Sequence, residues 1–67
     1  MERAYQMMEV IGVSDESFAQ ATRNAVRAAS QKMQGLLWFE VVEQRGRIDS
    51  GEVLEFQVKV RIGYRVV

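Results

Sequence analysis

The sequence predicts an α+β fold, in which one amphipathic helix packs on an antiparallel sheet of three strands, in the order strand, helix, strand, strand. Three observations support this prediction. Apolar residues recur at helical spacing over residues 15–34, polar and apolar residues alternate strictly over 54–66, and a turn cluster (Asp-Ser-Gly) occupies 49–51. There is no proline, low-complexity tract or repeat, so residues 1–67 are expected to form a single domain.

The first expected element is a strand over residues 4–12, because this segment is short, rich in apolar residues and closed by Gly12. The helix over residues 15–34 follows. Ser14 is its expected N-cap, with Asp15 and Glu16 in the first turn, and Gly35 its expected C-terminal cap. The residues of the apolar stripe lie three and four positions apart: Phe18, Ala21, Ala25, Ala28 or Ala29, Lys32 or Met33, and Leu36.

Residues 36–48 are rich in aromatic and β-branched side chains, which favours a second strand, and the turn cluster joins it to a third strand over 54–66 in a hairpin. A regular pleat alternates side chains between the two faces of the sheet. It therefore separates two sets of residues of the second strand: Leu37, Phe39 and Val41 on one face, where the helix is expected, and Trp38, Glu40, Val42 and Gln44 on the other.

The lengths of these elements do not match. A helix of 20 residues is about 30 Å long, whereas strands of 13 to 15 residues span roughly 43–50 Å. The helix therefore cannot cover the hairpin, and Ile62, Tyr64 and Val66 are expected to stay exposed at the overhanging end. A chain of 67 residues without cysteine is marginal as a monomer. Other copies of the chain are expected to cover the overhang.

Composition excludes several function classes. With neither histidine nor cysteine, the chain cannot form the usual zinc, Ser-His-Asp or Cys-His sites. Glu40 and Glu43 fall on opposite faces of a regular strand and predict no acid–base pair, so no enzyme and no metal site is expected. A net charge of zero argues against nucleic acid as a partner. No membrane-length apolar run or signal-peptide core is present, and the expected location is cytoplasmic.

The candidate binding residues each have two interpretations. Trp38 is either an interface or core ring, or a stacking platform for a planar ligand. Gln57 is either a solvated side chain, or an amide that can donate to and accept from the edge of a heterocycle. Arg45 and Arg65, with Arg47 and Arg61, either form a solubilising fringe or bind phosphate, for which a guanidinium is well suited.

Several segments resemble the dodecin family: Val13–Phe18 at the helix opening, Leu-Trp-Phe-Glu-Val at 37–41, Arg45-Gly46, and Phe-Gln-Val at 56–58 followed by Val-x-Ile-Gly-Tyr-Arg at 60–65. The resemblance spans essentially the whole chain. It implies a hollow homododecamer built from trimers, in which each strongly curved sheet partly wraps its helix. It also implies flavins bound in pairs at two-fold interfaces, between symmetry-related tryptophans.

By this resemblance, Trp38 is the stacking ring and Gln57 bonds the isoalloxazine edge, while Arg45 and Arg65 are candidates for the ribityl-phosphate region or another phosphorylated ligand. FMN is the expected flavin, with riboflavin and FAD as alternatives, and coenzyme A is a further candidate ligand. Trp38 and Arg45 are seven residues apart, so a regular pleat places them on opposite faces. One ligand could contact both only through a bulge, a twist or a second subunit.

The resulting hypothesis is a flavin storage and sequestering protein that quenches the photoreactivity of its ligand without turnover. Two alternatives are kept. One is a small FMN-dependent reductase, and the other is a purely structural oligomer in which Trp38 only fills an interface.

Overall fold

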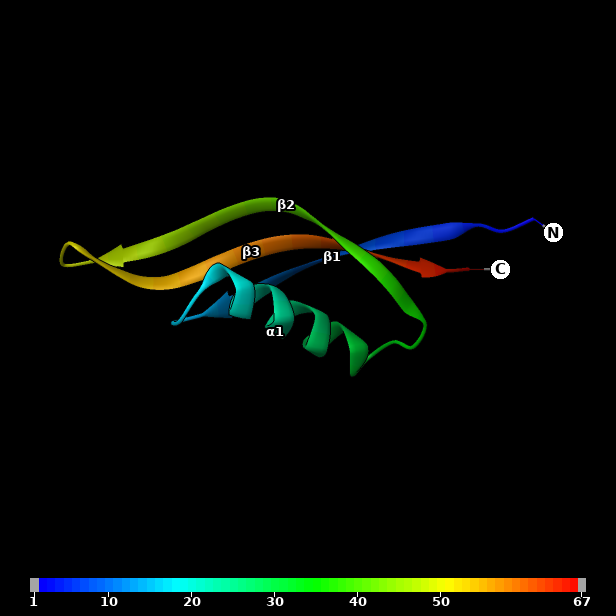
Figure 1. The fold of residues 1–67 in the computed structure, drawn as a ribbon, viewed down its shortest axis with the longest axis horizontal. Coiled ribbons are helices and arrows are strands. Elements are labelled where there is room, and N and C mark those ends of the chain that lie inside the picture. The colour runs from blue at the N-terminus through cyan, green and yellow to red at the C-terminus, as the bar shows by residue number, and fades with distance from the viewer. Residues whose placement is uncertain (1, 67) are drawn as a thin grey trace.

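The computed structural model describes residues 2–66, which form β1 (Tyr5–Ser14), α1 (Phe18–Ser30), β2 (Leu36–Asp49) and β3 (Glu52–Arg65). This order confirms the prediction. The three strands make one antiparallel sheet in the order β1-β3-β2, and α1 lies against one face of it (Figure 1). The strictly alternating β3 is therefore the central strand, paired on both sides.

The helix is shorter than the predicted 15–34, because Ser17, and not Ser14, is its N-cap. The Ser17 hydroxyl accepts a 2.9 Å hydrogen bond from the Gln20 amide. Ser14 instead closes the turn between β1 and α1. Its hydroxyl accepts hydrogen bonds from the backbone N–H groups of Glu16, at 2.9 Å, and Ser17, at 3.4 Å. Asp15 and Glu16 consequently precede the helix and do not lie in its first turn.

The other end of the helix also differs from the expectation. Gln31 is the C-cap, and its amide donates to the carbonyls of Ala28 and Ala29. Gly35 lies beyond the helix, at the entry to β2, where its φ of +79° is a conformation that glycine adopts at little cost. Its place in the sequence correctly marks a left-handed residue, but the helix has already ended.

The core forms where α1 meets β3. Its buried residues are Ala21, Ala25, Ala29, Val58, Val60 and Ile62. The alanines recur every four residues and give α1 a face of small side chains. On β1, Gly12 lies directly under this face, because a Cβ at that position would overlap the Ala21 carbonyl oxygen. Small residues on both sides therefore let the helix approach the sheet closely.

The helix packs against β1 and β3 and leaves β2 uncovered. Phe39 pairs with the buried Ile62, so it faces the helix side of the sheet as expected. Phe39 is nevertheless 49% exposed, and Val41 is 45% exposed. The helix therefore lies on the Phe39 face of the sheet, as expected, but it covers β1 and β3 on that face and not β2.

The overhang lies mainly at the turn end of the hairpin. The described chain measures 54 × 20 × 14 Å, and α1 has only 13 residues, or about 20 Å. Figure 1 shows β2 and β3 continuing past the start of the helix, away from both termini. Ile48 and Val53 are exposed there. Of the residues expected to overhang, Val66 is exposed and Tyr64 is half-buried. The expectation is wrong for Ile62, which is buried in the core.

Two extra residues interrupt the pleat of β2. The pairing with β3 shifts between Leu36 and Trp38 and again between Val41 and Glu43, so Leu37 and Val42 have no partner of their own. Such bulges bend a strand and increase its twist. Figure 1 shows β2 arching over α1. The curved sheet therefore partly encloses the helix.

Candidate functional site

The bulge at Val42 decides which residues of β2 share the outer face of the sheet, away from α1. Cross-strand partners lie on the same face, and Trp38 pairs with Gly63 while Arg45 pairs with Gln57. Gly63 and Gln57 are six residues apart on the regular β3, so they share a face. The extra residue thus brings Trp38 and Arg45 to the same face, which a regular pleat would not do.

The same bulge corrects the expectation for Glu40 and Glu43. They pair with Arg61 and Lys59, which share a face of β3, so the two carboxylates do not lie on opposite faces. Each has a basic neighbour: Glu43 lies 3.1 Å from Arg45 and 3.7 Å from Lys59, and Glu40 lies 4.0 Å from Arg61. The two carboxylates are therefore neutralised separately.

Trp38 is held by a glycine and an aromatic neighbour. Its six-membered ring lies over Gly63, where an added Cβ would overlap three ring atoms. Tyr5 of β1 packs against it edge to face, with 5.1 Å between ring centroids and an interplanar angle of 82°. Trp38 as a residue stays 40% exposed. A large aromatic surface is thus fixed in orientation and open to a ligand or a partner chain.

Gln57 is oriented by its neighbours on both sides of the amide. Arg45 Nε donates to Gln57 Oε1 at 2.8 Å, and Gln57 Nε2 donates to Glu55 Oε2 at 2.7 Å. The amide oxygen keeps a second acceptor position and the amide nitrogen a second hydrogen. Gln57 can therefore still offer one donor and one acceptor side by side, in an orientation that Arg45 and Glu55 select.

Arg65 lies near Trp38, at the other end of β3 from Gln57. It pairs with Tyr5, whose ring contacts Trp38. Among the ion pairs within residues 2–66, none includes Arg65. Its guanidinium is therefore available to an anion, whereas that of Arg45 already bonds Glu43 and Gln57.

The candidate residues form two groups. We call Tyr5, Trp38 and Arg65 the tryptophan cluster, and Arg45, Glu55 and Gln57 the glutamine cluster. Gln57 and Gly63 are six positions apart on β3, which is about 20 Å along the strand at roughly 3.3 Å per residue. One three-ring heterocycle is shorter than that. A single heterocycle of this size that contacts both Trp38 and Gln57 must therefore take them from different copies of the chain.

Sequence reasoning missed Tyr5, Gly63 and Glu55 as neighbours of the candidate residues. The alternation of residues 4–12 could have placed Tyr5 on one face with Met7 and Glu9. It could not have identified the facing residues, because that depends on β1 pairing with β3 in one register. The contacts of Gly63 and Glu55 depend in the same way on the pairing of β2 and β3.

Two other kinds of functional element are absent from residues 2–66. No group of three or more histidine, cysteine, aspartate and glutamate residues lies together there as a metal site would require. Within the same residues, no helix is long and apolar enough to span a membrane.

Comparisons with known proteins agree with one another. The family model described as Dodecin matches residues 4–67. The chain is 36% identical to the dodecin of Thermus thermophilus over 66 residues, which cover 98% of this chain and 96% of the relative. The solved structure of dodecin from Streptomyces davaonensis superposes with a TM-score of 0.94 at 37% identity, covering 100% of this chain and 98% of that one.

Two further sets of structures bear on the site. Those of the T. thermophilus dodecin include R45A, R65A and W38F mutants, with TM-scores of 0.92, 0.92 and 0.91, 33% identity, and coverage of 98% of this chain and 97–98% of theirs. The calcium dodecin of Mycobacterium tuberculosis, described as having a calcium-binding site, is 26% identical and superposes with a TM-score of 0.83, covering 96% and 91% of the two chains. With the family model matching nearly the whole chain, and the fold shared throughout, this protein belongs to the dodecin family.

Proposed function

We propose that this protein binds flavin, with FMN as the favoured form, at interfaces between copies of the chain, and that it stores the flavin and quenches its photoreactivity without turnover. The observation that carries the proposal is the placement of Trp38. Its ring is held over Gly63 and against Tyr5, yet the residue stays 40% exposed on the outer face of the sheet. Such a surface favours stacking with a planar ring system.

The glutamine cluster supports the same ligand class. An isoalloxazine carries an imide edge, which presents carbonyl oxygens and an N–H to its surroundings. Gln57 offers a matching donor and acceptor, and its amide is oriented by Arg45 and Glu55. Because Trp38 and Gln57 lie about 20 Å apart along one chain, the complete site in this proposal combines the tryptophan cluster of one copy with the glutamine cluster of another.

The exposed apolar surface supports assembly. On the outer face of β1, Tyr5, Met7, Ile11 and Val13 are between 38% and 46% exposed. Exposed apolar side chains of this kind, here with the ion pair of Glu9 and Arg61 among them, are typical of an interface between subunits. We propose that other copies of the chain cover it, in the dodecamer of trimers that family membership suggests.

The charges support a phosphorylated flavin. In the proposal, Arg65 reaches the phosphate of FMN, since it is free of ion pairs within residues 2–66 and lies beside the tryptophan cluster. Arg45 serves mainly to orient Gln57. Riboflavin would use the same stacking ring and amide, and FAD or coenzyme A would offer other phosphates to Arg65.

Flavin fluorescence tests the proposal directly. Adding the purified protein to micromolar FMN or riboflavin should quench the emission, because an electron-rich indole in contact with the excited ring allows rapid electron transfer. Trp38→Ala should abolish most of the quenching, and Trp38→Phe, which keeps a stacking ring, should retain part of the binding. No quenching by the wild-type protein, or equal quenching by Trp38→Ala, would contradict the proposal.

Two measurements accompany the titration. The mass of each variant in solution shows that a loss of quenching is not a loss of assembly. NADH and NADPH are then added to the flavin-loaded protein under anaerobic conditions. Storage without turnover predicts that the absorbance of the bound flavin does not bleach, whereas continued bleaching with turnover would indicate the reductase. A colourless protein that assembles but binds no flavin would favour the structural oligomer.

A further inference from the structure

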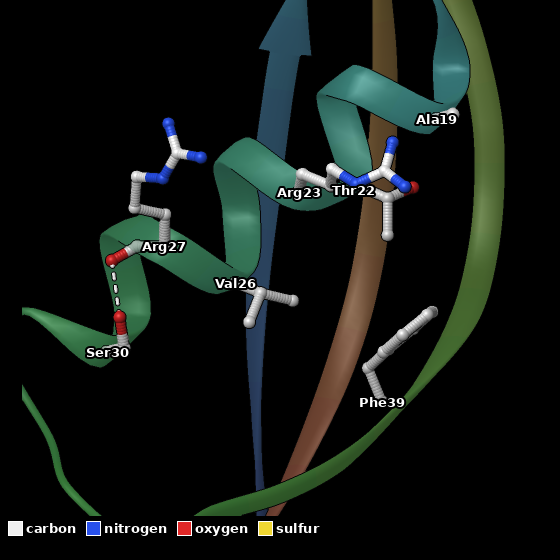
Figure 2. Close-up of a pocket in the computed structure, with 7 residues that line it drawn as sticks. All are labelled: Ala19, Thr22, Arg23, Val26, Arg27, Ser30 and Phe39. Carbon is white, nitrogen blue, oxygen red and sulfur yellow. Dashed lines mark hydrogen bonds between the residues drawn. The ribbon is translucent and has the colours of Figure 1, made fainter.

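A groove runs between α1 and β2 because the helix covers only β1 and β3. It encloses about 710 Å³ and lies on the helix side of the sheet, opposite the candidate flavin site. Figure 2 shows Val26 on α1 and Phe39 on β2 at opposite sides of the groove, with Arg23 and Arg27 extending from the helix. The groove therefore combines an apolar floor with a basic edge.

The two arginines of the groove have no ion-pair partner in the part of the chain that the structure describes. All the ion pairs among residues 2–66 join side chains of the sheet, and none includes Arg23 or Arg27. The two lie four residues apart, so they are neighbours on the helix surface and repel each other. An acidic partner at this rim would relieve the repulsion.

The turn end of the β2–β3 hairpin has the complementary character. We call residues 48–53 the hairpin tip. Ile48 and Val53 pair across it and are 76% and 60% exposed, so the tip is apolar on its sides. Asp49 and Glu52 form the last pair before the turn, and neither belongs to an ion pair within residues 2–66.

The tip is narrow and cannot reach the groove of its own chain. Ser50 and Gly51, with φ of 53° and 79°, form a two-residue turn of the type that closes a tight hairpin. The hairpin then runs past the start of α1 and away from the groove (Figure 1). An acidic, apolar projection and a basic, apolar groove are thus held apart on one chain, an arrangement that suits contact between two copies.

We propose that the hairpin tip of one copy inserts into the α1–β2 groove of the next, with Ile48 and Val53 against Val26 and Phe39, and Asp49 and Glu52 near Arg23 and Arg27. The inference rests on the self-association contained in the proposed function and adds the contact that drives it. Because the tip and the groove are different surfaces, the contact is heterologous and must close into a ring to give a finite assembly.

Charge reversal tests this contact. Native mass spectrometry and sedimentation velocity should show that Arg23→Glu with Arg27→Glu lowers the assembled fraction at micromolar concentration by roughly tenfold. Asp49→Lys with Glu52→Lys should do the same. Combining all four substitutions in one chain should restore the wild-type mass, because the complementarity is re-formed with opposite sign. The control, Lys32→Glu, reverses a charge that does not line the groove and should leave the assembly unchanged.

Cross-linking gives a second measurement that does not depend on charge. The chain has no cysteine, so Ile48→Cys with Ser30→Cys introduces one thiol at the tip and one at the groove. A short bismaleimide should then link several chains into closed or laddered products. The control, Ile48→Cys with Gln6→Cys, carries its second thiol at an exposed position of β1 that does not line the groove, and it should not give the ladder.

An unchanged mass in both reversal variants, or a wild-type protein that is monomeric, would overturn the inference. Failure of the quadruple variant to regain the mass would also count against it if circular dichroism shows the variant to be folded. Flavin quenching separates the two proposals. Absence of quenching by an assembled wild-type protein would contradict the flavin proposal alone, whereas reversal variants that stay assembled and still quench would contradict the tip-in-groove contact alone.

Discussion

Arg45 and Gln57 face each other across β2 and β3, and Arg45 Nε donates a 2.8 Å hydrogen bond to Gln57 Oε1. On the other side of the amide, Glu55 accepts from Gln57 Nε2. The arginine therefore determines which edge of the glutamine points toward a ligand. This assigns Arg45 a positioning role, distinct from direct contact with phosphate.

Arg45→Ala is expected to weaken the binding of FMN and riboflavin by the same factor. The substitution removes one hydrogen bond of the oriented amide, worth about 1 kcal/mol, so each Kd should rise roughly 2- to 10-fold. Parallel fluorescence titrations with the two flavins measure the ratio. If only FMN binding is weakened, Arg45 contacts the phosphate, and the positioning role is wrong.

Arg65→Ala is expected to weaken the binding of FMN much more than that of riboflavin. Arg65 is free of ion pairs within residues 2–66 and its guanidinium suits phosphate. Its loss should raise the Kd for FMN by about 10-fold, as for a charge-assisted bond of ~1.5 kcal/mol, and leave riboflavin nearly unchanged. The same titrations measure both, and equal losses would indicate a general effect on assembly. Arg65→Lys keeps the charge and should recover part of the FMN affinity.

Gly63→Ala is expected to displace Trp38, because the new Cβ would overlap the six-membered ring of the indole. Overpacking of this kind costs about 1–3 kcal/mol. Urea unfolding should show the lower stability, and flavin quenching should fall with it. Phenylalanine lacks the second ring, so Gly63→Ala should cost less in a Trp38→Phe background. Equal costs in the two backgrounds would show that the glycine and the ring do not constrain each other.

Ser17→Ala is expected to destabilise the helix by about 1 kcal/mol, because the Ser17 hydroxyl accepts a hydrogen bond from the backbone N–H of Gln20. Ser14→Ala removes a hydroxyl that bonds two amides of the turn before α1. Circular dichroism during urea unfolding measures both. If Ser17 is the cap, its alanine variant should show the greater loss of helical signal before global unfolding. The reverse order would favour the cap at Ser14.

The outline of the fold could be predicted from the sequence because its signals are local. The alternation of β3, the Asp-Ser-Gly turn and the alanine stripe of α1 each act within a few residues. The ends of the helix were harder to predict from the sequence. Ser14 and Ser17 are both good caps, and only the positions of the amides around them show which one begins the helix.

The candidate site depended more on tertiary structure. The sequence offered Trp38 and Gln57 as candidates because an indole can stack on a planar ligand and an amide can both donate and accept, and the resemblance to the dodecins implied these roles for them. Their neighbours could not be read in the same way. The ring of Tyr5 on β1 contacts that of Trp38 on β2 directly, across the central strand β3, although β1 and β2 are not paired with each other.

By itself, the sequence determined the order of the elements, the hairpin and the family to which the chain belongs. Only the tertiary structure decided that β3 is central, that Trp38 and Arg45 share a face, and that Trp38 and Gln57 lie too far apart to meet on one chain. For the shared face, the physical reason is the bulge at Val42. Side-chain alternation is a property of one strand and can be read from its sequence. A bulge exists only with respect to a partner strand, and one bulged residue moves all later side chains of the strand to the face opposite the one that regular alternation predicts.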